Sequence, residues 1–204
     1  MPSEPEAPGL RERKKTATRA ALSETALRLA LERGLSQVRV EEIAAGAGVS
    51  PRTFNNYFSS KEEAVVSLLA GRVRRFREAI ARHAAEEPLW DVIGGAALAL
   101  VPTASETHQW RQWVGLIMGT PSLEAVYLRA NASLERDLAL DIADRTGTDP
   151  QSDLFPRLAA CATVAAIRAA LQFWLDNQES VSYSALLQRA IAEVAAGLPA
   201  PPGK

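Results

Sequence analysis

The stretch 40–58, VEEIAAGAGVSPRTFNNYF, decides the fold. We expect a short helix over about 40–47 and a second over 51–57, because Gly48 breaks the pattern between them and supplies a turn conformation that a side chain resists. Ser50 is a good N-cap, and Pro51 is a good first helical residue. Two short helices joined in this way predict a helix-turn-helix.

The second helix of this motif has one apolar and one polar face. Its phenylalanines, Phe54 and Phe58, stand four residues apart and are predicted to pack inward. The outward side chains are then Arg52, Thr53, Asn55 and Asn56. Arginine pairs bidentately with guanine and asparagine with adenine, and the second helix of such a motif enters the major groove. The alternative is a helical hairpin with a polar face, which the poor helix propensity of these residues disfavours.

The charge of the chain is unevenly distributed. Residues 10–61 carry ten Lys/Arg and five Asp/Glu, whereas residues 62–204 carry thirteen and seventeen. Five cations crowd the start of the first helix, Arg11, Arg13, Lys14, Lys15 and Arg19, where they oppose the helix dipole. A basic N-terminal part and an acidic C-terminal part indicate that the N-terminal part binds a polyanion.

The whole chain is predicted to be all-α, with nine helices. Apolar periodicity, caps and breakers place them at about 10–33, 40–47, 51–57, 60–85, 89–100, 104–118, 123–146, 153–177 and 183–197. We expect a disordered tail at 1–9, a helix-turn-helix domain at 10–61, a ligand-binding and dimerisation domain at 62–198, and a second tail at 199–204.

Several classes of protein are disfavoured by what the sequence contains. There is no Gly-rich phosphate loop, no nucleophile elbow and no zinc-type His/Cys spacing, so we expect neither an enzyme, a cofactor nor a metal site. The one cysteine, Cys161, lies in an apolar run and is expected to be a buried hydrophobe in a reducing compartment. No uncharged apolar segment reaches the length of a membrane span, and we expect a cytoplasmic protein without a signal peptide.

The order and spacing of residues 14–66 resemble the DNA-binding domain of the TetR family. The matching residues are Gly34, 40–44, 47–50, Thr53-Phe54, Tyr57-Phe58 and 60–63. The resemblance implies a homodimer whose paired third helices enter successive major grooves of palindromic double-stranded operator DNA. It also implies that Thr53, Tyr57 and Lys61 touch the DNA, the last two chiefly at phosphates.

Two positions depart from the family pattern. Asn55 stands where tyrosine is usual, and Arg39 stands where threonine is usual at the start of the second helix. Asn55 can read a base instead of holding a phosphate, and Arg39 can reach a phosphate although it is a poorer cap. The predicted DNA-binding residues are therefore Arg39, Ser50, Arg52, Thr53, Asn55, Asn56, Tyr57 and Lys61.

The rear half contains bulky side chains suited to a small hydrophobic effector. The candidates are Phe76, Ile80, Trp110, Trp113, Ile117, Met118, Tyr127 and Phe173, with Arg168 as a polar anchor. The alternative for each apolar residue is ordinary core. Part of this set resembles actinobacterial regulators related to the mycofactocin-type repressor, some of which answer to long-chain acyl-CoA, and the resemblance implies a fatty acyl or acyl-CoA effector.

The last two helices carry small apolar faces. The first holds Ala159, Ala160, Ala162, Ala165, Ala166, Ala169 and Ala170, and the resemblance implies a four-helix dimer interface; an intrachain core is the alternative. The predicted function is that of a ligand-released repressor. A DNA-binding regulator without an effector, or a xenobiotic or antibiotic sensor that controls an efflux pump, remains an alternative.

Overall fold

The computed structural model describes residues 9–84, 86–177 and 182–200, and all regular structure within them is helical. The helices are α1 Leu10–Arg33, α2 Val40–Gly46, α3 Pro51–Asn55, α4 Lys61–Val66, α5 Leu68–Arg82, α6 Leu89–Ala97, α7 Thr107–Gly119, α8 Pro121–Thr146, α9 Leu154–Asp176 and α10 Tyr183–Ala195, with short 3-10 turns η1 Leu35–Gln37 and η2 Leu98–Leu100. Of the predicted tails at 1–9 and 199–204, residues 1–8 and 201–204 lie outside the described residues.

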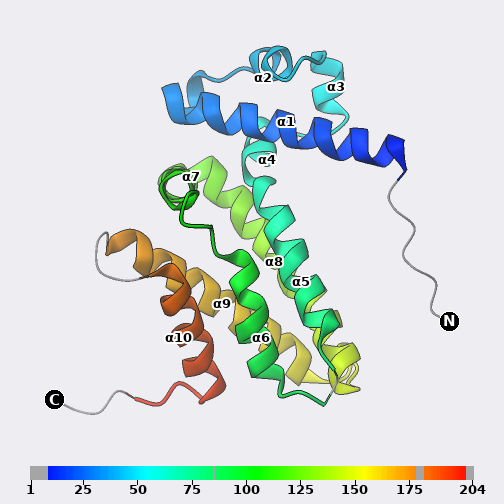
Figure 1. Cartoon of the computed structure of the whole chain (residues 1–204), viewed down its shortest axis with the longest axis vertical. Helices are drawn as coiled ribbons and strands as arrows, with labels where there is room; N and C mark the ends of the chain where they lie inside the picture. The colour runs from blue at the N-terminus through cyan, green and yellow to red at the C-terminus, as the bar shows by residue number, and fades with distance from the viewer. Residues whose placement is uncertain (1–8, 85, 178–181, 201–204) are drawn as a thin grey trace. The chain divides into compact units, whose positions relative to one another are not determined.

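The chain divides into two compact units. Unit 1 comprises residues 1–69 with 116–126, and unit 2 comprises 70–115 with 127–204. In unit 1, α1 packs against α2 and α4, and α2 packs against α3 (Figure 1). Its fully buried side chains include Leu22, Ile43 and Phe54. One small core therefore holds the helix-turn-helix together.

The predicted start and stop signals of unit 1 are confirmed. Gly34 ends α1 and donates its N–H to the carbonyl of Ala30. Gly48 has a φ of +68°, the left-handed conformation expected at the turn between α2 and α3. The Ser50 hydroxyl accepts the N–H of Thr53 at 3.1 Å, and the Ser60 hydroxyl accepts that of Glu63 at 3.1 Å. Local chemistry thus sets where α3 and α4 begin.

Several predicted boundaries shift in the structure. The third helix ends at Asn55 rather than 57, and the predicted long fourth helix divides at Ser67 into α4 and α5. The Ser67 hydroxyl donates to the carbonyl of Ala64 at 2.9 Å, which is how serine competes with helical hydrogen bonding. The sixth predicted helix begins at Thr107 rather than 104, because Glu106 accepts the N–H of Thr103 in a turn.

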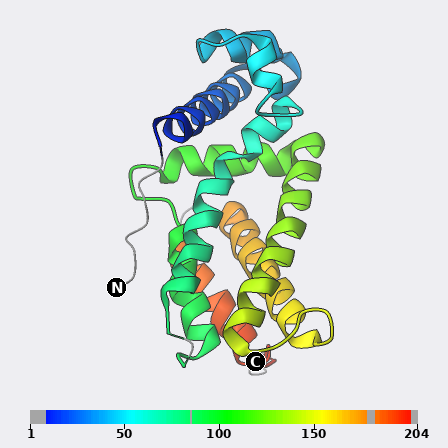
Figure 2. The same cartoon turned by 90° about the vertical axis from the view of Figure 1, so that its right-hand side faces the viewer.

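In unit 2, α10 packs along α9 and against α6, and both views show α9 and α10 side by side (Figures 1 and 2). A polar link joins α5 to α8: Arg77 donates to both carboxylate oxygens of Asp141 at 2.6 and 2.8 Å and to Asp137 at 3.1 Å. The hydrogen bond with Asp141 raises the pKa of Arg77. Such a two-pronged pair fixes orientation as well as contributing energy.

One helix of the described residues, α9, is long and apolar enough to match a membrane span by composition, with a mean hydropathy of 1.6 over its best window. However, 44% of that window is buried inside the protein, where α9 packs against α10. This is the behaviour of a core helix in a helical domain.

Two glycines with open space around them test the turn between α2 and α3. Gly48→Ala is expected to lower the free energy of unfolding by about 1–2 kcal/mol, because its positive φ disfavours a side chain. Gly95→Ala, in α6 at an ordinary helical φ, is expected to raise it by about 0.5–1 kcal/mol. Urea unfolding followed by circular dichroism measures both, and equal effects of the two substitutions would contradict the assignment of strain to Gly48.

Candidate functional site

The exposed face of α3 is polar and the opposite face is fixed in the core. Phe54 is 0% exposed and Phe58 is 2% exposed, with their ring centroids 5.7 Å apart. Arg52, Asn55 and Asn56 are exposed. The helix therefore presents three donor-rich side chains to solvent on a backbone that the two rings hold in place.

The remaining predicted DNA-binding residues around α3 are partly engaged in local structure. Thr53 and Tyr57 are half-buried, and Ser50 is exposed. The hydroxyls of Ser50 and Thr53 lie 2.9 Å apart, so both take part in the cap of α3. Their first role is to fix the start of the helix, which leaves the exposed arginine and asparagines as the side chains free to face a partner.

Lys61 has a structural role that the sequence pattern did not indicate. Its ammonium donates to the carbonyls of Leu35 at 2.8 Å and Val38 at 2.9 Å. These carbonyls belong to η1 and the residue that follows it, between α1 and α2. A lysine ammonium has three donors, so one remains for a phosphate. Lys61 thus connects the start of α4 to this segment and still presents a positive charge.

The poor cap at Arg39 is compensated by a neighbouring carboxylate. Glu42 accepts the backbone N–H of Arg39 at 2.9 Å and pairs with the Arg33 side chain at 2.9 Å. The Arg39 hydrogen bond is the main reason that the pKa of Glu42 is lowered, and Arg33 adds to it. Because the Glu42 carboxylate caps the start of α2, the exposed Arg39 side chain is not needed as a cap.

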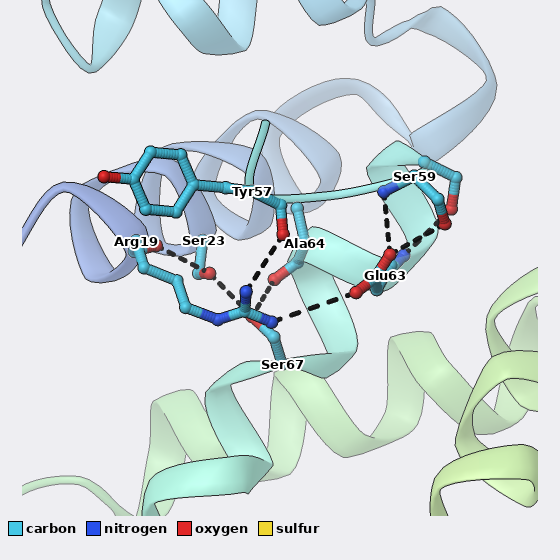
Figure 3. A network of polar contacts seen from close by, with 8 residues as sticks. Arg19, Ser23, Tyr57, Ser59, Glu63, Ala64 and Ser67 are labelled. Atoms are coloured by element: carbon cyan, nitrogen blue, oxygen red, sulfur yellow. Dashed lines mark hydrogen bonds and ion pairs between the residues drawn. The ribbon is translucent and has the colours of Figure 1, made fainter. Parts of the chain in front are cut away.

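Arg19 connects three parts of unit 1 (Figure 3). Its guanidinium donates to the carbonyl of Tyr57 at 2.9 Å and lies 3.8 Å from a carboxylate oxygen of Glu63. It also stacks over the ring of Phe58, 4.3 Å from the ring centroid. Glu63 in turn accepts the N–H and hydroxyl of Ser59 at 2.8 and 2.7 Å. The sequence grouped Arg19 with the cations near the start of α1; the structure shows that it holds the segment after α3 between α1 and α4.

The other four cations at the start of α1 have a different environment. Arg11, Arg13, Lys14 and Lys15 are all exposed, with Glu12 as the acidic residue among them. They belong to the same unit as α3. Together they form a basic surface that we call the α1 basic cluster.

In unit 2, five of the predicted effector residues are buried. Phe76, Ile80, Trp110, Trp113 and Tyr127 are each at most 6% exposed. Trp110 and Trp113 make an edge-to-face pair with centroids 4.9 Å apart. Burial raises the pKa of the Tyr127 phenol. The structure thus places these residues in the interior of the unit that carries them.

The other predicted effector residues are placed differently. Ile117 is buried and Met118 half-buried, but both belong to the segment that clusters with unit 1. Phe173 is 52% exposed, and Arg168 is exposed although its charge acts on the Tyr127 phenol. Phe173 precedes the buried Trp174 by one residue, which turns it about 100° away from the core face of α9. The structure therefore does not bring Phe173 together with the buried set.

Three of the cavities in the described part of unit 2 are lined mostly by residues that the sequence did not single out for an effector site. A groove of about 550 Å³ lies between α6 and α10 beside Trp90, one of about 480 Å³ lies between α8 and α9 beside Cys161, and one of about 410 Å³ lies beside Arg77. Cys161 is exposed rather than buried, which corrects the sequence expectation. Partial burial of the Cys161 thiol, followed by the charge of Glu135 and its hydrogen bond, raises the pKa of the thiol, which disfavours the reactive thiolate.

The exposed side of α9 carries an apolar stripe. Its members are Leu154, Leu158, Cys161, Ala165, Ala169 and Phe173, all exposed in the single chain. Leu154 is 73% and Leu158 is 59% exposed. Successive members lie three or four residues apart and so share one face of the helix. An apolar face of this length is typical of a surface that another chain covers.

Comparisons of sequence agree with this organisation. Residues 22–67 match the family described as "Bacterial regulatory proteins, tetR family", and residues 87–199 match the "MftR C-terminal domain". The chain is 34% identical over 180 residues to the HTH-type transcriptional regulator TcmR of Streptomyces glaucescens, covering 84% of this chain and 79% of TcmR. It is 28% identical over 187 residues to the mycofactocin biosynthesis transcriptional regulator MftR of Mycobacterium tuberculosis, covering 91% and 93%.

Solved structures show the same fold at low sequence identity. Thermus thermophilus FadR, a TetR-family repressor in complex with lauroyl-CoA, has 19% identity and a TM-score of 0.60, covering 91% of this chain and all of FadR. A TetR-family regulator from Rhodococcus sp. has 18% identity and a TM-score of 0.60, covering 90% and 100%. The complex of SmeT with triclosan has 17% identity and a TM-score of 0.58, covering 92% and 100%.

Arg19 can be tested against a second arginine of the same helix. Arg19→Met keeps the aliphatic stem but removes the contacts with Tyr57, Glu63 and Phe58, and is expected to lower the free energy of unfolding by about 1–2 kcal/mol. Arg28→Met removes an exposed pair with Glu32 and is expected to cost at most about 0.5 kcal/mol. Urea unfolding of both variants checks this, and an Arg19→Met variant as stable as Arg28→Met would refute the structural role of Arg19.

Proposed function

The chain belongs to the TetR family of DNA-binding transcriptional regulators, and we propose that it is a ligand-released repressor that binds palindromic operator DNA as a homodimer. The observation that supports this most directly is the reading face of α3: Arg52, Asn55 and Asn56 are exposed, while Phe54 fixes the helix from behind. Arginine and asparagine are the side chains best suited to the edges of guanine and adenine.

We assign the two kinds of DNA contact to different residues. Arg52, Asn55 and Asn56 read bases, with Ser50 and Thr53 at the edge of the same face. Arg39, Tyr57 and Lys61 contact phosphates, together with the α1 basic cluster. Phosphate contacts add affinity on any sequence and release counterions, whereas base contacts discriminate between sequences.

The dimer is proposed to form through the apolar stripe of α9 and the neighbouring face of α10. The inner face of α9 is already covered within the chain, so the exposed stripe is the part left for a partner. A second copy with two-fold symmetry presents the same stripe and gives a four-helix interface. Two reading heads related by this symmetry match a palindromic operator.

The effector is proposed to be a hydrophobic small molecule bound among the buried aromatic residues of unit 2. Effector binding lowers the affinity of the protein for operator DNA, and DNA binding lowers the affinity for the effector by the same factor. The lauroyl-CoA complex of FadR and the triclosan complex of SmeT illustrate two chemical classes, a fatty acyl-CoA and a xenobiotic, to be compared as effectors. The protein acts in the cytoplasm, where bacterial operator DNA lies.

The experiment that tests the proposed function is selection of bound duplexes from a random pool by the purified chain. The expected result is an enriched inverted repeat whose half-sites are about one helical turn apart. Recovery of unenriched sequence at low salt would contradict base reading. If neither fatty acyl-CoAs nor xenobiotics weaken operator binding, the result would favour the alternative of a regulator without an effector.

Base-reading and phosphate-binding residues differ in the salt dependence of their variants. Replacing Arg11, Arg13, Lys14 and Lys15 together by Gln is expected to weaken binding on every duplex and to reduce the slope of log K against log salt by up to about 3–4. Asn55→Ala is expected to keep the slope and to relax preference at one base pair by about 1–3 kcal/mol. Fluorescence anisotropy across salt concentrations measures both, and a changed slope for Asn55→Ala would reverse its assignment.

The dimer interface is tested by a charge on the α9 stripe. Phe173→Glu is expected to raise the dimer dissociation constant at least about tenfold, because formation of the dimer would then bury a carboxylate. Leu128→Glu, on α8 and 42% exposed, is the matched control and should leave it unchanged. Sedimentation velocity over a concentration series distinguishes them, and an unaltered Phe173→Glu dimer would remove this face from the interface.

A further inference from the structure

The groove between α8 and α9 lies beside the apolar stripe of α9. Its volume is about 480 Å³, and it is lined by Ala132, Glu135, Arg136, Ala139, Leu140, Pro150, Gln151, Arg157 and Cys161. Cys161 belongs both to the groove and to the stripe, and Leu140 remains 54% exposed. A molecule that covers the stripe at this end therefore meets the groove as well.

The rim of the groove is held in place by the loop that joins α8 to α9 (Figure 2). Within this loop Asp149 accepts the N–H of Gln151, and Asp153 accepts the N–H of Asp149, each at 2.8 Å. Arg157 donates to the carbonyl of Pro150 and so connects α9 to the loop. The loop carboxylates are thus used by local donors, and a groove that is already formed costs less to fill.

The aromatic member of the stripe lies at the other end of α9. Phe173 is 52% exposed and follows Cys161 by 12 residues, which is about 18 Å along a helix. A phenylalanine side chain does not span that distance, so the ring cannot enter the groove of its own chain. A second copy of the chain can supply it.

The two ends of α9 also differ in charge. Arg136 and Arg157 line the groove at the first end, together with Glu135, whose carboxylate lies 3.8 Å from the Cys161 thiol. At the second end Asp176 is exposed beside the last carbonyls of the helix, where the helix dipole is negative. Two copies of α9 that run antiparallel bring these opposite charges together, whereas parallel copies place like charges side by side.

We propose that the Phe173 side chain of a second copy fills this groove, in a dimer whose two α9 helices run antiparallel. A two-fold axis through the centre of the stripe sets Phe173 of one copy opposite Leu154 of the other. Packed helices cross at an angle, so the end of one lies over the groove beside the other. Asp176 then reaches the rim near Arg136 and Arg157. This inference rests on the dimer of the proposed function and adds its orientation.

Disulfide crosslinking tests the orientation in full-length protein whose one native thiol is removed by Cys161→Ser. Antiparallel helices set Leu158 of one copy opposite Ala169 of the other, and leave like residues about 16 Å apart. Leu158→Cys combined with Ala169→Cys is therefore expected to give a covalent dimer when diamide accepts the two electrons and two protons, and each single variant is expected to give none. Non-reducing electrophoresis measures the crosslink.

Charge reversal tests whether the second copy reaches the groove. Arg136→Glu and Asp176→Arg each place like charges at the rim and are expected to raise the dimer dissociation constant about five- to tenfold. The two substitutions together should return it to within about threefold of the original value. Arg129→Glu, exposed on the same helix but outside the groove, is the matched control and should leave it unchanged. Sedimentation velocity over a concentration series measures all four proteins.

Three results would overturn this inference and leave the proposed dimer in place. They are crosslinking of either single cysteine variant as readily as the double variant, no crosslink in a chain that sediments as a dimer, and an effect of Arg136→Glu no larger than that of Arg129→Glu. An unsubstituted chain that sediments as a monomer at every concentration would remove the proposed dimer together with this inference.

Discussion

The burial of Phe54 and Phe58 is the constraint on which the rest of the structure depends. Because both rings are held in the core of unit 1, the five residues of α3 have one orientation, and their polar side chains face solvent. So short a helix has little stability of its own. Its position is secured by the cap at Ser50 and by Arg19, which stacks on Phe58 and binds the carbonyl of Tyr57. The DNA reading that we propose for α3 requires such a fixed backbone carrying exposed donors.

Unit 2 satisfies its polar groups unevenly. Arg77 and Arg72 each donate to more than one partner, which suits groups whose role is to hold helices together. The indoles of Trp110 and Trp113 lack partners in the described chain, which is uncommon for buried donors.

The all-helical fold, the position of the turn at Gly48 and the inward phenylalanines were predictable because they depend on local signals: caps, a breaker and helical periodicity. The roles of Arg19 and Lys61 were not, because their partners lie 38 and 26 residues away in sequence and are backbone carbonyls that no residue type marks. The exposure of Phe173 was not predictable either, since periodicity alone does not say which face of α9 the chain itself covers. The DNA-contacting and effector-contacting residues stay predictions.

The most direct test of the central claim is a competition titration between the selected inverted repeat and a scrambled duplex of equal length at physiological salt. Base reading by α3 predicts that the repeat binds about 10³-fold or more tightly than the scrambled duplex. It also predicts that Arg52→Ala lowers this ratio, while its affinity for the scrambled duplex falls only by the amount expected from the loss of one positive charge. Equal affinity for the two duplexes would contradict the claim that the exposed face of α3 reads sequence.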